Sequence, residues 1–226
     1  TTFALNQHHG IQAIERFGWE RTGRDDFDGD GHLVEFTVGQ VTALVLFQAT
    51  LPPPNRRDLV AAHPGAPVFE AIGCAECHTP TLRLTSNEFI EPGPYNRPGA
   101  MSASDTSTLV RASLDLPQGD GGYYVSLYSD LKRHRMCDAE IRHFCNERLR
   151  QDNVQEELFM TMKLWDLATS APYGHRGDCS TISEAILAHG GEARASRQRF
   201  LELAASQKQT LVEFLLSLGA SQVEGR

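Results

Sequence analysis

The stretch Gly73-Cys74-Ala75-Glu76-Cys77-His78-Thr79-Pro80 places two thiols and an imidazole within one short segment. The whole chain of 226 residues has five cysteines, and two of these five lie in this motif. On one helical turn, positions i and i+3 share a face and position i+4 lies beside them. Cys74, Cys77 and His78 have this spacing. Both sulfur atoms and the ring can therefore point at one flat group.

Cys-x-x-Cys-His is typical of haem attachment in c-type cytochromes, where two thiols bind the haem vinyl groups and the adjacent His binds the iron. A thioredoxin-like redox pair follows a strand in a βαβ context, whereas the pattern before Cys74 is helical. A zinc site needs a second ligand pair at similar spacing, and Cys137 and Cys145 are too far apart for one. We therefore expect one covalent haem c on Cys74 and Cys77, with His78 as an axial ligand.

The residue types alone do not select the second axial ligand of the iron. Met and His both occur as second axial ligands of haem iron. A Met ligand raises the haem potential and a second His lowers it. The downstream candidates are His134, Met136, Met160, Met162, His175 and His189.

Composition and charge exclude several classes of protein. With 40% hydrophobic residues, the 226-residue chain can form one domain or one and a half. A formal net charge of −8, with Lys and Arg scattered, argues against nucleic-acid partners. No apolar run reaches the roughly 20 residues of a membrane span. The chain begins without Met or an apolar leader, which predicts a trimmed precursor or a piece of a longer polypeptide.

The three cysteines outside the motif are Cys137, Cys145 and Cys179. They allow one disulfide with one thiol left over, and Cys137 and Cys145 flank the stretch "DAEIRHF". Three free buried thiols are the alternative.

Apolar spacing predicts a mainly α fold with a helical lead over 1–54 that ends at a triple proline. The Cys-x-x-Cys-His motif indicates that the remaining residues, 55–226, form a cytochrome c-like domain. The Gly-, Pro-, Ser- and Asp-rich segment 79–136 is expected to be irregular. Helices are predicted over 8–20, 37–51, 66–78, 138–150, 154–163, 181–189 and 207–218.

An acidic turn, "DDFDGDG", places Asp26, Asp28 and Asp30 at alternate positions before a glycine, as at the start of an EF-hand loop. Position 12 of such a loop would be Thr37, where a bidentate Glu is expected. A Ca²⁺ site completed by oxygens from elsewhere and a solvated turn are both open interpretations.

Six stretches in order carry a family resemblance: "HHGIQAIERFG", "FTVGQVTALVLFQATLPPP", "FEAIGCAECHTPTL", "YSDLKRHRM", "LWDLATSAPYGHRG" and "TISEAILAHGGEA". Through them the chain from about His8 to Leu218 resembles the C-terminal half of the dihaem oxidoreductases related to bacterial dihaem cytochrome c peroxidase, in the branch labelled thiol-oxidoreductase-like. The resemblance implies electron transfer between this haem and a second, peroxidatic haem. Because the sequence holds one Cys-x-x-Cys-His, that second haem is expected on another domain or chain.

In this family the helix after a Pro-Tyr-x-His-x-Gly element brings the distal ligand to the haem. His189 stands at that position, so the resemblance implies an iron bound by His78 and His189, with Met136 as the alternative distal ligand. It also implies that four further residues surround the haem: Trp165, Pro172, Tyr173 and His175.

An iron with both axial positions filled would act as an electron relay. The alternatives are a peroxidase with an open distal site on this chain, and a stand-alone electron carrier that docks a small redox protein. Covalent haem c is attached outside the bacterial inner membrane, so we expect a periplasmic or otherwise exported protein, in which a disulfide can persist.

Overall fold

The structure is a computed structural model, and it describes residues 11, 26, 29–32, 35–51, 63–91, 110–150 and 154–219. The helix predicted over 8–20 lies outside the described residues except for Ile11. The chain divides into two compact units. The first combines Thr1–Pro52 with Thr85–Pro117, and the second combines Pro53–Leu84 with Gln118–Arg226.

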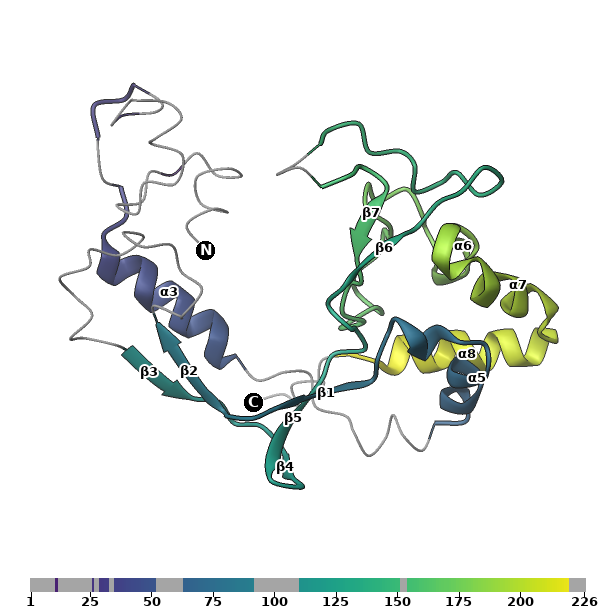
Figure 1. Ribbon diagram of the computed structural model, residues 1–226, viewed down its shortest axis with the longest axis horizontal. Helices are drawn as coiled ribbons and strands as arrows, with labels where there is room; N and C mark the ends of the chain where they lie inside the picture. Colours follow the sequence, from purple (N-terminus) through teal and green to yellow (C-terminus); the bar gives the residue numbers. More distant parts are fainter. Residues whose placement is uncertain are drawn as a thin grey trace. The chain divides into compact units, whose positions relative to one another are not determined.

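The fold is mixed α and β, so the prediction of a mainly α protein is wrong (Figure 1). Of the described residues, 34% are helical and 18% lie in strands or bridges. The error comes chiefly from segment 79–136, which forms short antiparallel strands. Strands of two to five residues carry too little alternation between apolar and polar residues to be recognised from sequence.

The first unit holds helix α3 (Val38–Thr50) and strands β2 (Glu88–Glu91) and β3 (Val110–Ser113). Thr37 and Gln40 form a capping box that starts α3, as predicted for a helix over 37–51. The two strands pair antiparallel, and α3 contacts both. Val41 is the buried centre of this unit's apolar cluster.

The second unit holds helices α5 (Gly65–Ala71), α6 (Ile182–Leu187), α7 (Arg194–Glu202) and α8 (Ala205–Ser217). Figure 1 shows α5 beside α8, and the contacts between them confirm this pairing. The buried core consists of Phe69, Ile72, Ile182, Phe200, Leu211, Phe214, Leu215 and Leu218. The helices predicted over 66–78, 181–189 and 207–218 therefore occur, although the first continues as a separate 3-10 turn.

Short sheets join the remaining segments of this unit. β1 (Thr81–Leu84) and β4 (Gln118–Gly119) pair with opposite edges of β5 (Gly122–Ser126). β6 (Arg133–Arg135) pairs with β7 (Leu158–Met160). The helix predicted over 154–163 is therefore wrong, because β7 lies within that segment.

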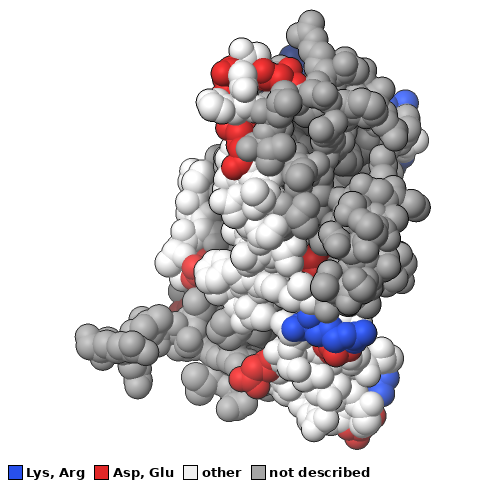
Figure 2. All heavy atoms as spheres, turned by 90° about the vertical axis from the view of Figure 1, so that its left-hand side faces the viewer, with Lys and Arg blue, Asp and Glu red and all other residues white. Residues whose placement is uncertain are grey.

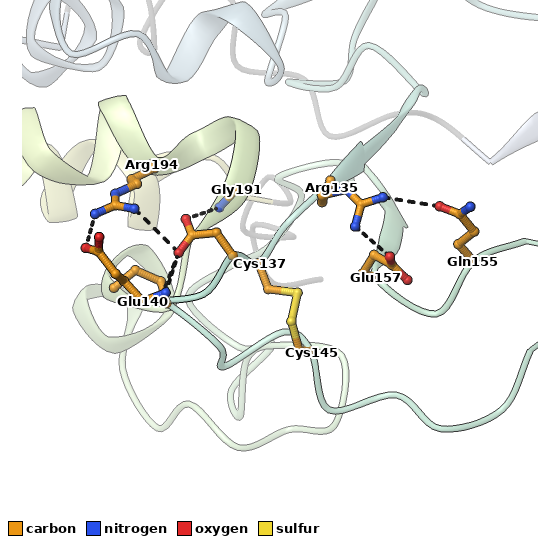
Figure 3. Close-up of a disulfide and its surroundings, with 10 residues drawn as sticks. Arg135, Cys137, Glu140, Cys145, Gln155, Glu157, Gly191 and Arg194 are labelled. Carbon is orange, nitrogen blue, oxygen red and sulfur yellow. Dashed lines mark hydrogen bonds and ion pairs between the residues drawn. A yellow bond between two sulfur atoms is a disulfide. The ribbon is translucent and has the colours of Figure 1, made fainter.

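The helix predicted over 138–150 is also wrong, and a disulfide explains why. Cys137 and Cys145 are bonded, with their Cα atoms 5.7 Å apart and a sequence separation of 8 (Figure 3). Eight residues of α-helix would separate these atoms by about 12 Å. The enclosed segment instead turns on Asp138, whose carboxylate accepts hydrogen bonds from the backbone N–H groups of Glu140 and Ile141. Cys179 is left as a buried free thiol.

Among the described residues, no helix combines the length and apolar character that a bilayer crossing requires. On the face drawn in Figure 2, the described basic side chains are few, and the acidic ones gather at the top of the view and occur in separate spots elsewhere.

The close crossing of α5 and α8 depends on Gly65. A Cβ atom there would lie 2.5 Å from Cβ of Phe214 and closer still to the carbonyl oxygen of Thr210. We expect Gly65→Ala to lower the free energy of unfolding by about 1–3 kcal/mol, because the helices must move apart. Urea unfolding followed by circular dichroism measures this change.

Gly39→Ala is the matched control, since a Cβ atom at Gly39 in α3 would meet nothing within 4 Å. Its expected effect is neutral or stabilising by up to about 1 kcal/mol. Equal stability of Gly65→Ala and the parent protein would contradict the close packing of α5 against α8 at Gly65.

Candidate haem site

The Cys-x-x-Cys-His motif follows α5 directly. Gly73, at φ +85°, reverses the backbone after α5, and the 3-10 turn η1 (Cys74–Glu76) begins at the next residue. The backbone N–H of His78 donates to the carbonyl oxygen of Cys74 at 2.9 Å. Cys74 and Cys77 are both free thiols and are partly buried. The turn thus holds the two thiols and the imidazole on one compact segment.

The ring of His78 is fixed through Nδ1, which donates to the carbonyl oxygen of Tyr128 at 2.9 Å. Burial lowers the pKa of His78 to about 4, and the hydrogen bond to the backbone of Tyr128 offsets this only in part. The ring is therefore neutral. Because Nδ1 carries the proton in this hydrogen bond, Nε2 is the nitrogen with a lone pair for a metal.

His189 has the same arrangement at the end of α6. Its Nδ1 donates to the carbonyl oxygen of Ala185 at 2.6 Å, and burial lowers its pKa. The ring of Phe144 meets it edge-on, with centroids 5.8 Å apart.

The two predicted axial ligands lie near each other. The neighbouring His189 contributes to the lowered pKa of His78, so the two rings are within electrostatic range. They are 189 − 78 = 111 positions apart in the sequence. The fold therefore places His78 and His189 within electrostatic range of each other, and their role as iron ligands stays a prediction.

Two glycines after His189 let the chain pack against the segment that follows β6. Gly191 has φ +54°, and a Cβ atom there would collide with the carbonyl oxygen of Arg135. The N–H of Gly190 donates to the carbonyl oxygen of Met136 at 3.0 Å. The side chain of Met136 packs against the apolar cluster of Cys137, Phe144, Cys179 and Ala188. The backbone of Met136, the alternative distal ligand, is thus hydrogen-bonded to the residue after His189. The Met136 side chain packs in this cluster.

Tyr128 connects the motif to the core, and sequence reasoning did not identify it. It has φ +52°, which is uncommon for a bulky residue. Its ring packs edge-on against Phe69 and Phe214, with centroids 5.8 and 6.0 Å away, while its carbonyl group faces His78. The backbone N–H groups of Tyr128, Ser129 and Asp130 donate to the carbonyl oxygens of Pro80, Thr79 and Cys77.

His134 lies between two carboxylates. Its Nε2 is 2.9 Å from Asp130 and its Nδ1 is 2.8 Å from Glu192. The hydrogen bond with Glu192, followed by that with Asp130, raises the pKa of His134. Both ring nitrogens are thereby occupied, which argues against His134 as an iron ligand. We call this trio the carboxylate clamp.

The clamp connects the two halves of the candidate site. Although burial opposes ionisation of Asp130, hydrogen bonds from Lys132 and His134 lower its pKa to about 2. The N–H of Asp130 also donates to the carbonyl oxygen of Cys77. Glu192 lies in η3 (Gly191–Ala193), directly after His189 and its glycines. The clamp therefore joins the segment beside Cys77 to the segment beside His189.

The residues implied around the haem have structural contacts of their own. Trp165 donates through Nε1 to the carbonyl oxygen of Ser126 at 2.7 Å. The Tyr173 hydroxyl donates to the carbonyl oxygen of Leu167, and Pro172 follows a cis peptide bond. His175 is exposed and hydrogen-bonded to Glu147. None of these contacts tests proximity to a haem, so that role stays a prediction.

In the acidic turn, carboxylate groups accept hydrogen bonds from backbone N–H groups of the same turn. Asp26 accepts hydrogen bonds from the N–H groups of Gly29 and Gly31, and Asp30 accepts one from His32. Asp28 lies outside the described residues. Calcium at this turn stays a prediction.

Comparison with known proteins indicates the class of protein to which this part of the chain is similar. The family model described as "Di-haem oxidoreductase, putative peroxidase" matches residues 123–218. This confirms the predicted resemblance over the C-terminal part of the chain. The matched residues include Tyr128, Met136 and His189, whereas the Cys-x-x-Cys-His motif precedes them.

Over these residues the chain is similar to haem oxidoreductases of a peroxidase type, and the name of the family implies haem as the cofactor. No curated protein and no solved structure matches the chain.

The carboxylate clamp predicts a pH-dependent contribution to stability. Because the pKa of His134 is raised in the folded state, this contribution is complete below about pH 6.5 and is lost as the pH rises through the raised value. We therefore expect His134→Gln to destabilise the protein more at about pH 5.5 than at about pH 9. Urea unfolding of both proteins at the two pH values measures the difference.

Glu192→Gln removes the larger contributor to the raised pKa and should abolish most of the same pH dependence. Parallel stability profiles for the parent protein and His134→Gln would rule out a charged, clamped imidazole.

Proposed function

We propose that this chain is a c-type cytochrome domain that carries one covalent haem and transfers electrons to or from a second haem of a di-haem oxidoreductase. One observation carries the proposal: His78 and His189 come from distant parts of the sequence, lie within electrostatic range of each other, and each holds a neutral ring with Nδ1 on a backbone carbonyl. Metal-binding histidines characteristically have this outer hydrogen bond, which fixes the ring and directs the other nitrogen to the metal.

The state of the two thiols supports attachment of a haem over redox chemistry of a Cys pair. Burial raises the pKa of Cys74 to about 12, and burial followed by the charge of Asp130 raises that of Cys77. Redox-active pairs require a thiol with a lowered pKa, since the thiolate is the nucleophile. Cys74 and Cys77 are therefore suited to permanent thioether bonds beside His78.

The two histidines decide which role the domain can have. A bound haem supplies a one-electron couple at its iron. Two imidazole ligands lower its potential relative to a Met ligand and leave no position for peroxide. The hydrogen bonds to Tyr128 and Ala185 fix both rings, and Phe144 packs edge-on against His189. The chain's contribution is thus to fix two ligands and exclude water, which suits an electron relay.

The partner in this proposal is a second haem on another domain or chain, with a small redox protein as the alternative electron donor or acceptor. Support comes from the di-haem description of the matching family and from the one Cys-x-x-Cys-His in this sequence. Periplasmic location is part of the same proposal, because haem c attachment and the Cys137–Cys145 disulfide both belong to an oxidising compartment.

The family description also favours a second candidate, a peroxidase whose open iron lies on this chain. This would require that His189 does not bind the iron. One spectroscopic experiment separates the two functions.

We expect the oxidised protein to give a low-spin ferric EPR signal, and His189→Ala to convert most of it to a high-spin signal because the sixth position becomes open. Met136→Leu is the matched control, since the carbonyl oxygen of Met136 accepts a hydrogen bond from Gly190, the residue after His189, and it should leave the signal low-spin. A dominant high-spin signal in the parent protein would favour the peroxidase. Loss of the low-spin signal only in Met136→Leu would identify Met136 as the ligand.

Covalent attachment is tested separately. We expect haem-stained denaturing gels to show a haem-bearing chain for the parent protein, and none for the double variant Cys74→Ser/Cys77→Ser. Cys179→Ser should still stain, because its thiol lies in a different apolar cluster. Haem that leaves the denatured parent protein would rule out a c-type cytochrome.

A further inference from the structure

A second group of ligand-type side chains lies outside the candidate haem site. His143, Asp178 and Cys179 present one nitrogen, one oxygen and one sulfur atom that all lie within 4.8 Å of one another. Nε2 of His143 is 3.5 Å from Sγ of Cys179 and 3.2 Å from Oδ1 of Asp178. Three different donor atoms therefore converge on one point.

Two constrained loops hold this group. His143 lies inside the loop that the Cys137–Cys145 disulfide closes (Figure 3 shows the disulfide). Asp178 and Cys179 end a tight loop in which Tyr173 and Cys179 exchange backbone hydrogen bonds of 2.7 and 3.0 Å. The donor atoms are thus positioned by the backbone.

Asn146 orients the carboxylate from behind. Its Nδ2 donates to Oδ2 of Asp178 at 3.0 Å, while Oδ1 of the same carboxylate faces His143. The amide oxygen of Asn146 is buried and has no hydrogen-bond partner among the described residues. An outer partner of this kind is what a ligating carboxylate usually has.

The geometry does not suit a Cys-His nucleophile. In such a site the carboxylate binds the ring nitrogen that does not face the thiol. Here both Asp178 and Cys179 approach the same Nε2. Burial, followed by the charges of Asp178 and Glu184, raises the pKa of the Cys179 thiol, which disfavours a free thiolate. Although burial opposes it, the hydrogen bond with His143 lowers the pKa of Asp178, and a cation among the three donors would take the place of that hydrogen bond.

We propose that His143, Asp178 and Cys179 bind one zinc-class divalent cation, with solvent in the fourth position. Zn²⁺ takes sulfur, imidazole nitrogen and carboxylate oxygen in tetrahedral sites, whereas Ca²⁺ and Mg²⁺ prefer oxygen alone. Cys179 is 2% exposed, and the side chains of His143 and Asp178 are each 36% exposed, so the site is anchored inside and open to solvent. Binding converts the thiol to a thiolate and releases its proton to water.

The test uses the full-length haem-loaded protein, treated with a chelator and then titrated with ZnCl₂ against a competing chromophoric chelator. We expect one zinc ion per chain, and at least about tenfold weaker binding for each of His143→Gln, Asp178→Asn and Cys179→Ser. His175→Gln is the matched control, because it lies in the same loop as Asp178 and is hydrogen-bonded to Glu147 instead. Its zinc affinity should be unchanged.

Zinc K-edge absorption reads the ligands without interference from haem iron. It should show one sulfur at about 2.3 Å together with nitrogen and oxygen neighbours, and no sulfur for Cys179→Ser. Should the buried Cys179→Ser variant fail to fold, the two partly exposed variants still decide the outcome. Unchanged affinity in His143→Gln and Asp178→Asn, or a zinc spectrum without sulfur in the parent protein, would overturn the proposal.

Discussion

The hydrogen bond from His78 to the carbonyl oxygen of Tyr128 ties the Cys-x-x-Cys-His motif to the core of the second unit. Tyr128 can offer that carbonyl only because its backbone is left-handed, and this conformation costs of the order of 1–3 kcal/mol. Burial of its ring against Phe69 and Phe214 offsets the cost, as do the backbone hydrogen bonds around it. Core packing and ligand orientation are therefore linked through one residue.

The opposite side of the site is positioned by different means. α6 begins at a capping box on Thr181 and ends beside His189, and Gly191 allows a close approach to Arg135 that a side chain would block. The carboxylate clamp then connects this segment to the one beside Cys77. Each imidazole thus has a backbone hydrogen bond of its own, and the clamp links the two segments that carry them.

The sequence was informative where the signal is local. The apolar spacing of the helices predicted over 37–51 and 181–189 and the spacing of the Cys-x-x-Cys-His motif depend on residues a few positions apart. The pairing of His78 and His189 as ligands of one haem was predicted from a family resemblance, since no spacing rule links residues 111 positions apart.

The errors fall where long-range contacts override local preference. Segment 138–150 has a helical pattern, yet the Cys137–Cys145 bond is incompatible with a helix. Strands as short as Gln118–Gly119 exist only because a partner strand is adjacent. Tyr128 could not have been predicted, because its role depends on a positive φ and a carbonyl direction. Helix α7 was not predicted, and Phe200 is its one buried residue, so its sequence carries little apolar periodicity.

The path of the chain through β1, β5 and β4 has one further consequence. Leu84, where the chain leaves the second unit, and Gln118, where it returns, both stand opposite Tyr123 on either side of the central strand. Two strand spacings separate them by about 10 Å, which three or four residues can span. Residues 85–117 therefore form an insertion into the second unit, because the chain leaves that unit and returns to it at neighbouring points. The entropic cost of such an insertion grows only with the logarithm of its length, so descendants of this chain can lengthen or shorten it while keeping the register of the sheet.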